Sequence, residues 1–211
     1  MAAGFFVVLE GPEGAGKSTL TRALAQRMRA GGLEPVVVRE PGGTPAAESL
    51  RSELLDADRG WTPEAELLYL CAARADLVAK VIGPALARGA IVLSDRFELS
   101  TRAYQIAGRG LPREQTEWVN RAATGGLTAN LTLVIDVPVG LGQARQIAAG
   151  KVRDRLDRES AAFHARVVDA YLAAQGPGIV HLDGTQDAGA VGEQAWGALV
   201  AVRPDLFPRG Q

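Results

Sequence analysis

The chain has 211 residues and a formal net charge of −1, with 23 Lys and Arg against 24 Asp and Glu. This length predicts one domain over residues 1–211, and a composition of 47% hydrophobic and 22% charged residues is typical of soluble globular proteins. The balanced charge argues against a dedicated nucleic-acid binder, and no apolar run is long enough to span a membrane. The single cysteine, Cys71, excludes an intramolecular disulfide framework and favours a reducing, cytoplasmic location.

The predicted elements alternate between short apolar strands and helices. Continuous apolar runs, typical of strands buried on both faces, lie at 5–10, 35–38, 91–95, 131–136 and 179–183. Helical spacing covers 18–30, 46–55, 63–88, 97–104, 113–123, 139–149, 159–175 and 187–202, with Pro84 expected to kink or break the third of these. The alternation predicts an α/β fold, a five-stranded parallel sheet flanked by helices on both faces. We expect the tail, 203–211, to be flexible.

Residues 11–18 read GPEGAGKS and match the phosphate-binding pattern G-x-x-x-x-G-K-[ST]. Glycines let consecutive N–H groups turn toward phosphate oxygens, and the following helix presents its positive end to them. We expect Lys17 to reach the β- and γ-phosphates and the Ser18 hydroxyl to bind Mg²⁺. Because a strand precedes the motif and a helix follows it, the motif predicts a P-loop for a nucleoside triphosphate. The expected nucleotide-binding residues are Gly11, Pro12, Glu13, Gly14, Ala15, Gly16, Lys17, Ser18 and Thr19.

Two features favour a small-molecule kinase over other P-loop classes. Neither Asn120 nor Asn130 begins the Asn-Lys-x-Asp sequence with which GTPases read guanine. Asp95 and Arg96 follow a predicted strand at its carboxyl end, which faces the ligand crevice in open α/β sheets. We expect Asp95 to join Ser18 around Mg²⁺ and Arg96 to bind an acceptor phosphate; the alternative is a capping Asp beside a solvated Arg.

Basic residues gather in segment 150–159, and another arginine lies in the long helix. The segment is either a mobile lid that neutralises charge on the transferring phosphoryl group or a solvated charged loop. Arg74 either extends to solvent or reads a base or phosphate with its planar guanidinium group. The basic residues of the segment are Lys151, Arg153, Arg155 and Arg158.

These motifs together resemble the thymidylate kinase family, from about Phe5 to about Trp196. The resemblance is carried by the P-loop, REPGGT at 39–44, AAR at 72–74, DR-x-x-x-ST at 95–101, YQ at 104–105 and DR at 154–155. It implies a P-loop kinase fold and transfer of the γ-phosphoryl group of ATP to dTMP. The products would be dTDP, for dTTP synthesis, and ADP. It also implies a requirement for Mg²⁺ and a homodimer.

The resemblance implies roles for the matched residues. Lys17, Arg96 and the lid arginines would carry catalysis, with Ser18 and Asp95 at the metal. The implied acceptor-site residues are Glu13 near the sugar hydroxyl of dTMP, Arg96 on its phosphate with Arg51 as a helper, Arg74 at a thymine carbonyl, and Ser100 and Gln105 near the base.

The P-loop contains no arginine and the lid is basic, which is similar to bacterial-type members whose lid supplies the arginines. Arg155 is then the implied γ-phosphate contact, with Arg153 the second choice. One position departs from the pattern: similar bacterial enzymes stack a Phe on thymine where this chain has Leu70. Leucine forfeits about 1 kcal/mol of stacking. Whether Tyr69, rotated by about 100° around the helix, compensates is left open.

Some alternatives remain. Within kinases, the acceptor is dUMP, CMP or AMP; outside them, the chain is a nucleotide-dependent switch without acceptor chemistry. His164 and His181 are expected to be structural, because neither lies near a Cys or another His at ligand spacing. By family likeness, the Glu40–Pro41 bond is expected to be cis and helix 63–88 to form a dimer surface.

Overall fold

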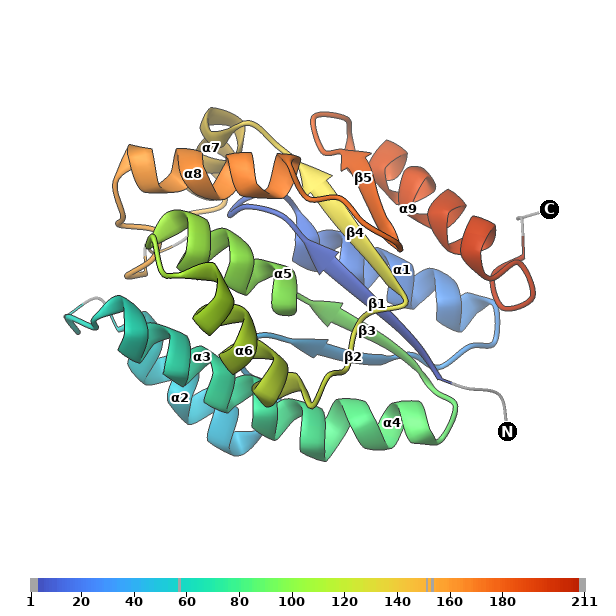
Figure 1. Cartoon of the computed structure of the whole chain (residues 1–211). Coiled ribbons are helices and arrows are strands. Elements are labelled where there is room, and N and C mark those ends of the chain that lie inside the picture. The colour runs from blue at the N-terminus through green and yellow to red at the C-terminus, as the bar shows by residue number, and fades with distance from the viewer. Residues whose placement is uncertain (1–3, 57, 151, 153, 209–211) are drawn as a thin grey trace.

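The structure, a computed structural model, describes residues 4–56, 58–150, 152 and 154–208. Its strands form one parallel five-stranded sheet in the order β2-β3-β1-β4-β5 (Figure 1). They are β1 (Phe5–Glu10), β2 (Val36–Arg39), β3 (Ile91–Asp95), β4 (Leu131–Asp136) and β5 (Ile179–Asp183). All the strands expected from the apolar runs are present, and the predicted α/β fold is confirmed.

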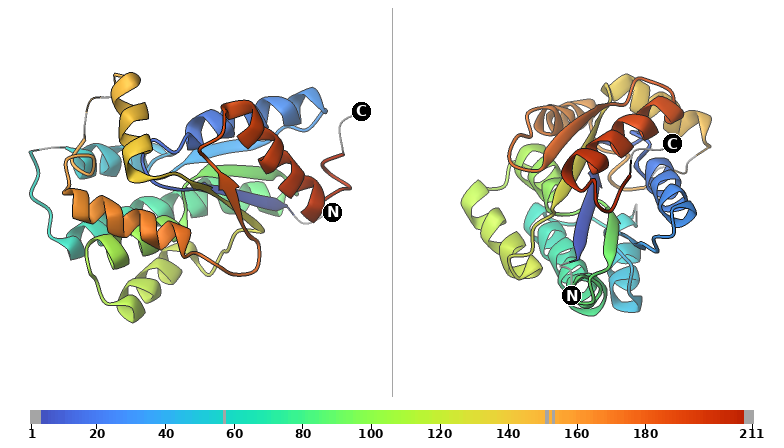
Figure 2. Two further views of the ribbon diagram at one scale, coloured as in Figure 1. Left: turned by 90° about the horizontal axis from the view of Figure 1, so that it is seen from above. Right: turned by 90° about the vertical axis from the view of Figure 1, so that its right-hand side faces the viewer.

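The central strand β1 sends alternate side chains to opposite faces of the sheet. Leu9 packs in a core cluster with Leu24 of α1 (Lys17–Ala30) and Leu199 of α9 (Ala188–Val202). Phe6 packs on the other face, with its ring centroid 5.0 Å from that of Phe97. The helices on this face include α3 (Pro63–Leu77), α4 (Gly83–Ala87), α5 (Glu98–Thr101) and α8 (Ala161–Leu172). Figure 2 shows the sheet between the two helical layers, which accounts for the apolar character of its central strands.

The two edge strands are less buried than the sequence predicts. Val37 of β2 is 44% exposed, and Val38 is the buried residue of that strand. In β5, Leu182 is buried while His181 and Asp183 are exposed. An edge strand has one neighbour instead of two, and a short apolar run does not reveal its place in the strand order.

The predicted helix over 63–88 continues past Pro84 but is not uniformly α-helical. A π-helical turn, η1 (Val78–Ile82), joins α3 to α4, and the N–H of Gly83 donates to the carbonyl of Val78. Proline lacks an N–H and crowds the carbonyl one turn earlier, so the wider turn accommodates Pro84. The helix after β3 also runs beyond the expected Tyr104, because α5 continues into a second π-helical segment, η2 (Arg102–Gly108).

Two consecutive helices begin with the same capping arrangement. In α2 (Pro45–Leu55) and in α3, a proline stands at the first turn, and the preceding threonine hydroxyl, of Thr44 or Thr62, accepts an N–H from the first turn. The remaining helices are α6 (Arg113–Thr124) and α7 (Val139–Ala148). Within the described part of the chain, no helix has the length and apolar character needed to cross a membrane.

Part of the C-terminal tail, which was expected to be flexible, packs on the core through Phe207. Phe207 is fully buried, and its ring lies 5.9 Å from that of Phe5 and 5.7 Å from that of Trp196. The indole Nε1 of Trp196 donates to the carbonyl of Pro208 at 3.3 Å. One aromatic side chain therefore anchors the tail, a contact that its prolines conceal in the sequence.

His181 bridges β4, β5 and the end of α8. Its Nδ1 lies 2.9 Å from the Asp136 carboxylate and its Nε2 lies 2.7 Å from the Ala174 carbonyl. Neither partner can donate, so both bonds form only when the ring is protonated. Burial opposes the charge, but the bonds to Ala174 and Asp136 raise the pKa of His181 above its ordinary value.

We therefore expect His181→Ala to destabilise the protein more at pH 5.5 than at pH 8.5. With a folded-state pKa above the unfolded value, the stabilisation is complete below about pH 6.5 and is lost as the pH rises through the folded-state pKa. The partly exposed pair limits the effect to about 1 kcal/mol. Urea unfolding at both pH values measures it, with His164→Ala as control. Equal destabilisation at both pH values would contradict the charged bridge.

Candidate active site

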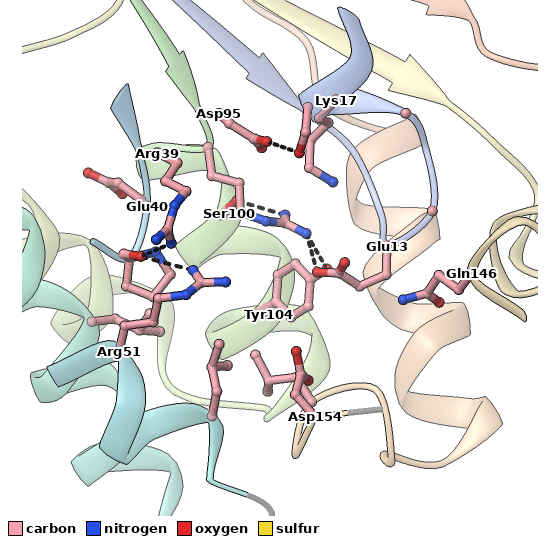
Figure 3. Close-up of a pocket in the computed structure, with 18 of the residues that line it drawn as sticks. Glu13, Lys17, Arg39, Glu40, Arg51, Asp95, Ser100, Tyr104, Gln146 and Asp154 are labelled. Atoms are coloured by element: carbon pink, nitrogen blue, oxygen red, sulfur yellow. Dashed lines mark hydrogen bonds and ion pairs between the residues drawn. The ribbon is translucent and has the colours of Figure 1, made fainter. Parts of the chain in front are cut away.

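A pocket of about 510 Å³ lies at the carboxyl ends of the central strands (Figure 3). It is lined by the P-loop, the segments after β2 and β3, helices α2, α3 and α7, η2, and the segment before α8. Among the described lining residues, six side chains are basic and four are acidic. The basic ones are Lys17, Arg39, Arg51, Arg74, Arg96 and Arg145. This excess of positive charge suits a site for phosphate groups.

The P-loop forms the turn between β1 and α1. Gly11, Gly14 and Gly16 have φ angles of 139°, 74° and 97°, which residues with a Cβ rarely adopt. Gly16 precedes the first turn of α1, so the positive end of this helix points toward the pocket. Of the predicted nucleotide-binding residues, the pocket lining includes Glu13, Gly14, Gly16, Lys17, Ser18 and Thr19, whereas Gly11, Pro12 and Ala15 shape the turn.

Lys17 is folded back onto the loop that carries it. Its Nζ donates to the carbonyl of Gly11 at 2.9 Å and to that of Pro12 at 2.8 Å. Burial, together with the nearby charge of Arg96, lowers the pKa of Lys17 to about 8. The ammonium group is thus poorly compensated, and a bound phosphate would supply the negative charge that it lacks.

The two predicted metal ligands lie side by side. The Ser18 hydroxyl donates to Asp95 Oδ2 at 2.6 Å, and Figure 3 shows this contact beside Lys17. Mg²⁺ prefers oxygen ligands and binds through one or two protein oxygens with waters and substrate phosphates. A hydroxyl and a carboxylate next to the P-loop fit this requirement. No cluster of three or more His, Cys, Asp or Glu suited to a metal occurs among the described residues.

Arg96 lies at the centre of the pocket on a strained backbone. Its φ is +77°, the one positive φ among the described residues other than glycine, and costs about 1–2 kcal/mol. Its Nη2 donates to Glu13 Oε1 at 2.5 Å and to the Tyr104 hydroxyl at 3.0 Å. Its Nη1 donates to the hydroxyls of Ser100 and Tyr171 at 3.1 and 2.9 Å. These bonds fix the guanidinium group between the P-loop and η2.

Glu10 and Tyr171 support this arrangement, and the sequence reasoning missed both. The fully buried Glu10 carboxylate accepts from the N–H groups of Phe97 and Ser100 and from the hydroxyls of Ser100 and Tyr171. The Ser100 hydroxyl, expected near the base, is therefore engaged with Glu10, at 2.6 Å. A carboxylate that ends an apolar strand next to the P-loop was the available signal for Glu10.

Two further arginines, Arg39 and Arg51, lie across the pocket from Lys17 (Figure 3). Arg51 Nη1 donates to the Pro41 carbonyl at 2.9 Å, and Arg39 Nη2 donates to both carboxylate oxygens of Glu48, at 3.0 and 2.9 Å. Burial, together with repulsion from Arg39, lowers the pKa of Arg51. Both arginines line the pocket, so an anion between them would be favoured. The expected cis bond between Glu40 and Pro41 is present.

Of the two side chains considered for the position of the stacking aromatic, Leu70 faces the pocket and Tyr69 does not. Leu70 lines the pocket, together with Leu55 of α2 and Leu156 of the lid. Tyr69 packs on Trp61 instead, with ring centroids 4.4 Å apart. This wall of the pocket is therefore aliphatic, and the one-residue shift on the helix keeps Tyr69 out of it.

Arg74 and Gln105 line the pocket, but the side chains of both also donate hydrogen bonds to other residues of the protein. Arg74 Nε donates to Glu40 Oε2 at 2.7 Å, its Nη1 to Thr101 and Asn120, and its Nη2 to the Phe97 carbonyl. A thymine carbonyl would share a donor with one of these partners, and that contact stays a prediction. Gln105 Nε2 donates to Glu66 Oε1 at 2.7 Å.

The expected γ-phosphate contact, Arg155, is held away from the pocket in this structure. Its side chain is buried outside the pocket, where Nε donates to the Leu54 carbonyl at 2.9 Å and Nη2 to Glu66 Oε2 at 2.7 Å. A carboxylate inside the protein thus holds the guanidinium group that was expected to contact the γ-phosphate. Arg153, the second choice, lies outside the described residues, as does Lys151.

Arg145 is a pocket cation that the sequence reasoning missed. It lines the pocket on α7 and is the single charged residue of that helix. One turn earlier, a Cβ on Gly142 would lie 2.4 Å from the Glu13 carbonyl, and one on Gly14 would lie 2.1 Å from the Gly142 carbonyl. Helix α7 therefore packs backbone to backbone on the P-loop, which brings Arg145 to the phosphate side. The signal was a lone charge one turn after a helical glycine.

Comparison with known proteins agrees with this geometry. The model of the thymidylate kinase family matches residues 9–195. A thymidylate kinase of Pseudomonas fluorescens (strain SBW25) is 45% identical over 212 residues, which cover 99% of each chain. A thymidylate kinase of Pseudomonas putida (strain F1) is 52% identical over 175 residues, 82% of this chain and 83% of the relative. This chain belongs to the thymidylate kinase family.

Proposed function

We propose that the pocket is the active site in which the γ-phosphoryl group of ATP is transferred to dTMP, giving dTDP and ADP. The observation that carries this is the position of Arg96, which is fixed between the P-loop and the wall that contains Leu70. The triphosphate of ATP fits the P-loop and Lys17, which form the donor half of the pocket. The acceptor fits the opposite, acceptor half, where Arg51 and the aliphatic wall lie. Family membership supports this assignment of the reaction.

The chemistry requires charge neutralisation more than proton abstraction. A phosphate monoester has a second pKa of about 6, so dTMP enters as a dianion and needs no strong general base. Lys17 and Arg96 then stabilise the charge on the transferring group and hold donor and acceptor in line. Ser18 and Asp95 would hold Mg²⁺, which neutralises the donor phosphates.

The decisive experiment measures ADP formation with MgATP and a panel of monophosphates: dTMP, dUMP, CMP, AMP and GMP. We expect strong stimulation by dTMP and weaker stimulation by dUMP. Turnover with another acceptor alone would keep the kinase chemistry and overturn the acceptor. Nucleotide binding without stimulation by any acceptor would favour a regulatory switch.

We expect Arg145→Ala to lower kcat by about tenfold to a hundredfold, with the KM for dTMP changed less than about threefold. Arg145 adjoins the donor half through α7, so its loss removes positive charge from the ATP phosphates. Steady-state kinetics measures both constants. Arg22→Ala, on α1 outside the described pocket lining, is the control for loss of one arginine. A rise confined to the KM for dTMP would move Arg145 to the acceptor half.

We also propose that the chain forms a homodimer through α3 and α6. These neighbouring helices carry large exposed apolar side chains, Leu68 at 57% and Trp118 at 71% exposure. We expect light scattering to give twice the chain mass, and Trp118→Glu to shift it toward one chain mass. Leu172→Glu, on α8, is the matched control. A Trp118→Glu protein that remains dimeric would contradict this surface.

A further inference from the structure

A buried carboxylate lies directly behind the acceptor half of the pocket. Glu66, on α3, is fully buried and is not a lining residue. Its Oε1 accepts from Gln105 at 2.7 Å and from Arg109 at 3.1 Å, and its Oε2 accepts from Arg109 and Arg155, both at 2.7 Å. Burial raises its pKa, but the bonds from Arg109 and Arg155 outweigh this and lower the pKa of Glu66, which keeps it ionised at neutral pH.

Arg155 fixes the lid segment at this carboxylate. Besides the bond to Glu66, its Nε donates to the Leu54 carbonyl at 2.9 Å and its backbone N–H donates to the Leu55 carbonyl at 3.3 Å. Its neighbour Leu156 lines the pocket. Because Arg155 is anchored outward, the next side chain faces inward, where it extends the aliphatic wall.

A second ion pair fastens the other end of the segment. Arg109, which binds Glu66, also donates through Nη1 to Glu159 at 2.6 Å. Gln105 reaches the same Glu66 from the pocket side. Glu66 therefore joins three parts of the chain: the long helix, the π-helical segment that lines the acceptor half, and the lid.

We propose that Glu66 is a positioning residue that docks the lid on the acceptor half through Arg155, and that the docked Leu156 completes the binding wall for the thymine base. This inference rests on the proposed function. Leu156 then supplies apolar contact on a wall where Leu70 lacks a π-face. The role of Arg155 is to hold the lid in place, and among the described residues Lys17 and Arg145 are the cations that would bind the donor phosphates.

The kinetic test compares the wild type with Glu66→Gln, Arg155→Met, the double variant and Leu156→Ala. We expect each single variant to raise the KM for dTMP by about tenfold, with the KM for ATP changed less than about twofold. Glu66→Gln and Arg155→Met both disrupt the contact between Glu66 and Arg155, so the double variant should be no worse than the worse single one. Glu193→Gln, which breaks an exposed pair with Arg27 on the opposite face, is the control and should change neither constant.

A phosphate-binding role for Arg155 makes a different prediction. Arg155→Met would then lower kcat with little effect on the KM for dTMP, and Glu66→Gln would leave kcat unchanged. That pattern, or additive effects in the double variant, would overturn the proposal.

Amide hydrogen exchange provides a readout that does not depend on turnover. In folded Glu66→Gln and Arg155→Met proteins, peptides covering 154–159 should exchange at least about tenfold faster, while β1 stays protected. Unchanged exchange in the lid would overturn the docking. Should Glu66→Gln fail to fold, Arg155→Met gives both readouts. Suppose that lid exchange speeds up in the two variants as expected, but that the wild type does not phosphorylate dTMP. This result would contradict the proposed function and leave the docking of the lid intact.

Discussion

Lys17→Ala should lower kcat by at least about 10²–10³-fold while the protein stays folded. In this structure the ammonium group binds two carbonyls of its own loop, Gly11 and Pro12, and lies close to Arg96. A transferring phosphoryl group would be its main anionic partner, and removal of one preorganised stabilising charge has an effect of this size. Steady-state ADP formation with saturating ATP and dTMP measures the loss.

Stability distinguishes this loss of catalysis from unfolding. The folded-state pKa of Lys17, about 8, lies below its ordinary value of 10.5, so the charged form disfavours the folded state. Wild-type stability should therefore rise between pH 8 and pH 10.5, where the unfolded chain binds more protons at this site. Lys17→Ala removes that slope and, without ligand at pH 7, should have a Tm equal to or above that of the wild type. Near wild-type turnover would contradict the P-loop assignment.

Arg96→Ala should lower kcat/KM for dTMP by about a hundredfold or more, because a charge-assisted contact to the acceptor phosphate is lost. The same change removes the ion pair between Arg96 and Glu13, and the Glu13 carboxylate would then repel the phosphate. Arg96→Lys should recover only part of the activity, since an ammonium group cannot reproduce the planar, forked contacts. Kinetics with dTMP varied at saturating ATP measures the effect. Unchanged use of dTMP would exclude Arg96 from the acceptor site.

Arg96→Gly is the matched control for backbone strain. Glycine adopts a φ of +77° freely, so this variant should be more stable than Arg96→Ala by about 1 kcal/mol. Because both variants lack the guanidinium group, both should show the same loss with dTMP. A large difference in activity between them would mean that backbone position, and not charge, governs the acceptor site.

The fold and the phosphate-binding half of the pocket could be predicted because their signals are local. The apolar runs gave the strand positions, and the spacing of glycines before Lys17 defined the P-loop. The approach of Ser18 to Asp95 followed from the sheet order: Asp95 ends β3, and Ser18 begins the helix that follows the neighbouring parallel strand β1.

The remaining features depend on contacts between distant parts of the chain. Arg155 was assigned from the resemblance of its segment to a basic lid, but its position is set by Glu66, 89 residues earlier. Phe207 is anchored by rings at both ends of the chain. Arg145 required the backbone contact between α7 and the P-loop. No spacing rule within a segment contains such information, because tertiary packing decides each case.

The contact between Gly14 and Gly142 bears on which half of the pocket is the better target for a selective inhibitor. Two backbones touch there with no side chain between them, so the phosphate cradle has no room to widen on that side. A compound aimed at the donor half would have to match a preformed shape. The wall of the acceptor half consists of leucine side chains, and one of them, Leu156, belongs to the lid that Arg155 fixes to Glu66. Such a wall can adjust to different ring systems. Inhibitors directed at the acceptor half would therefore be easier to make selective than inhibitors directed at the donor half.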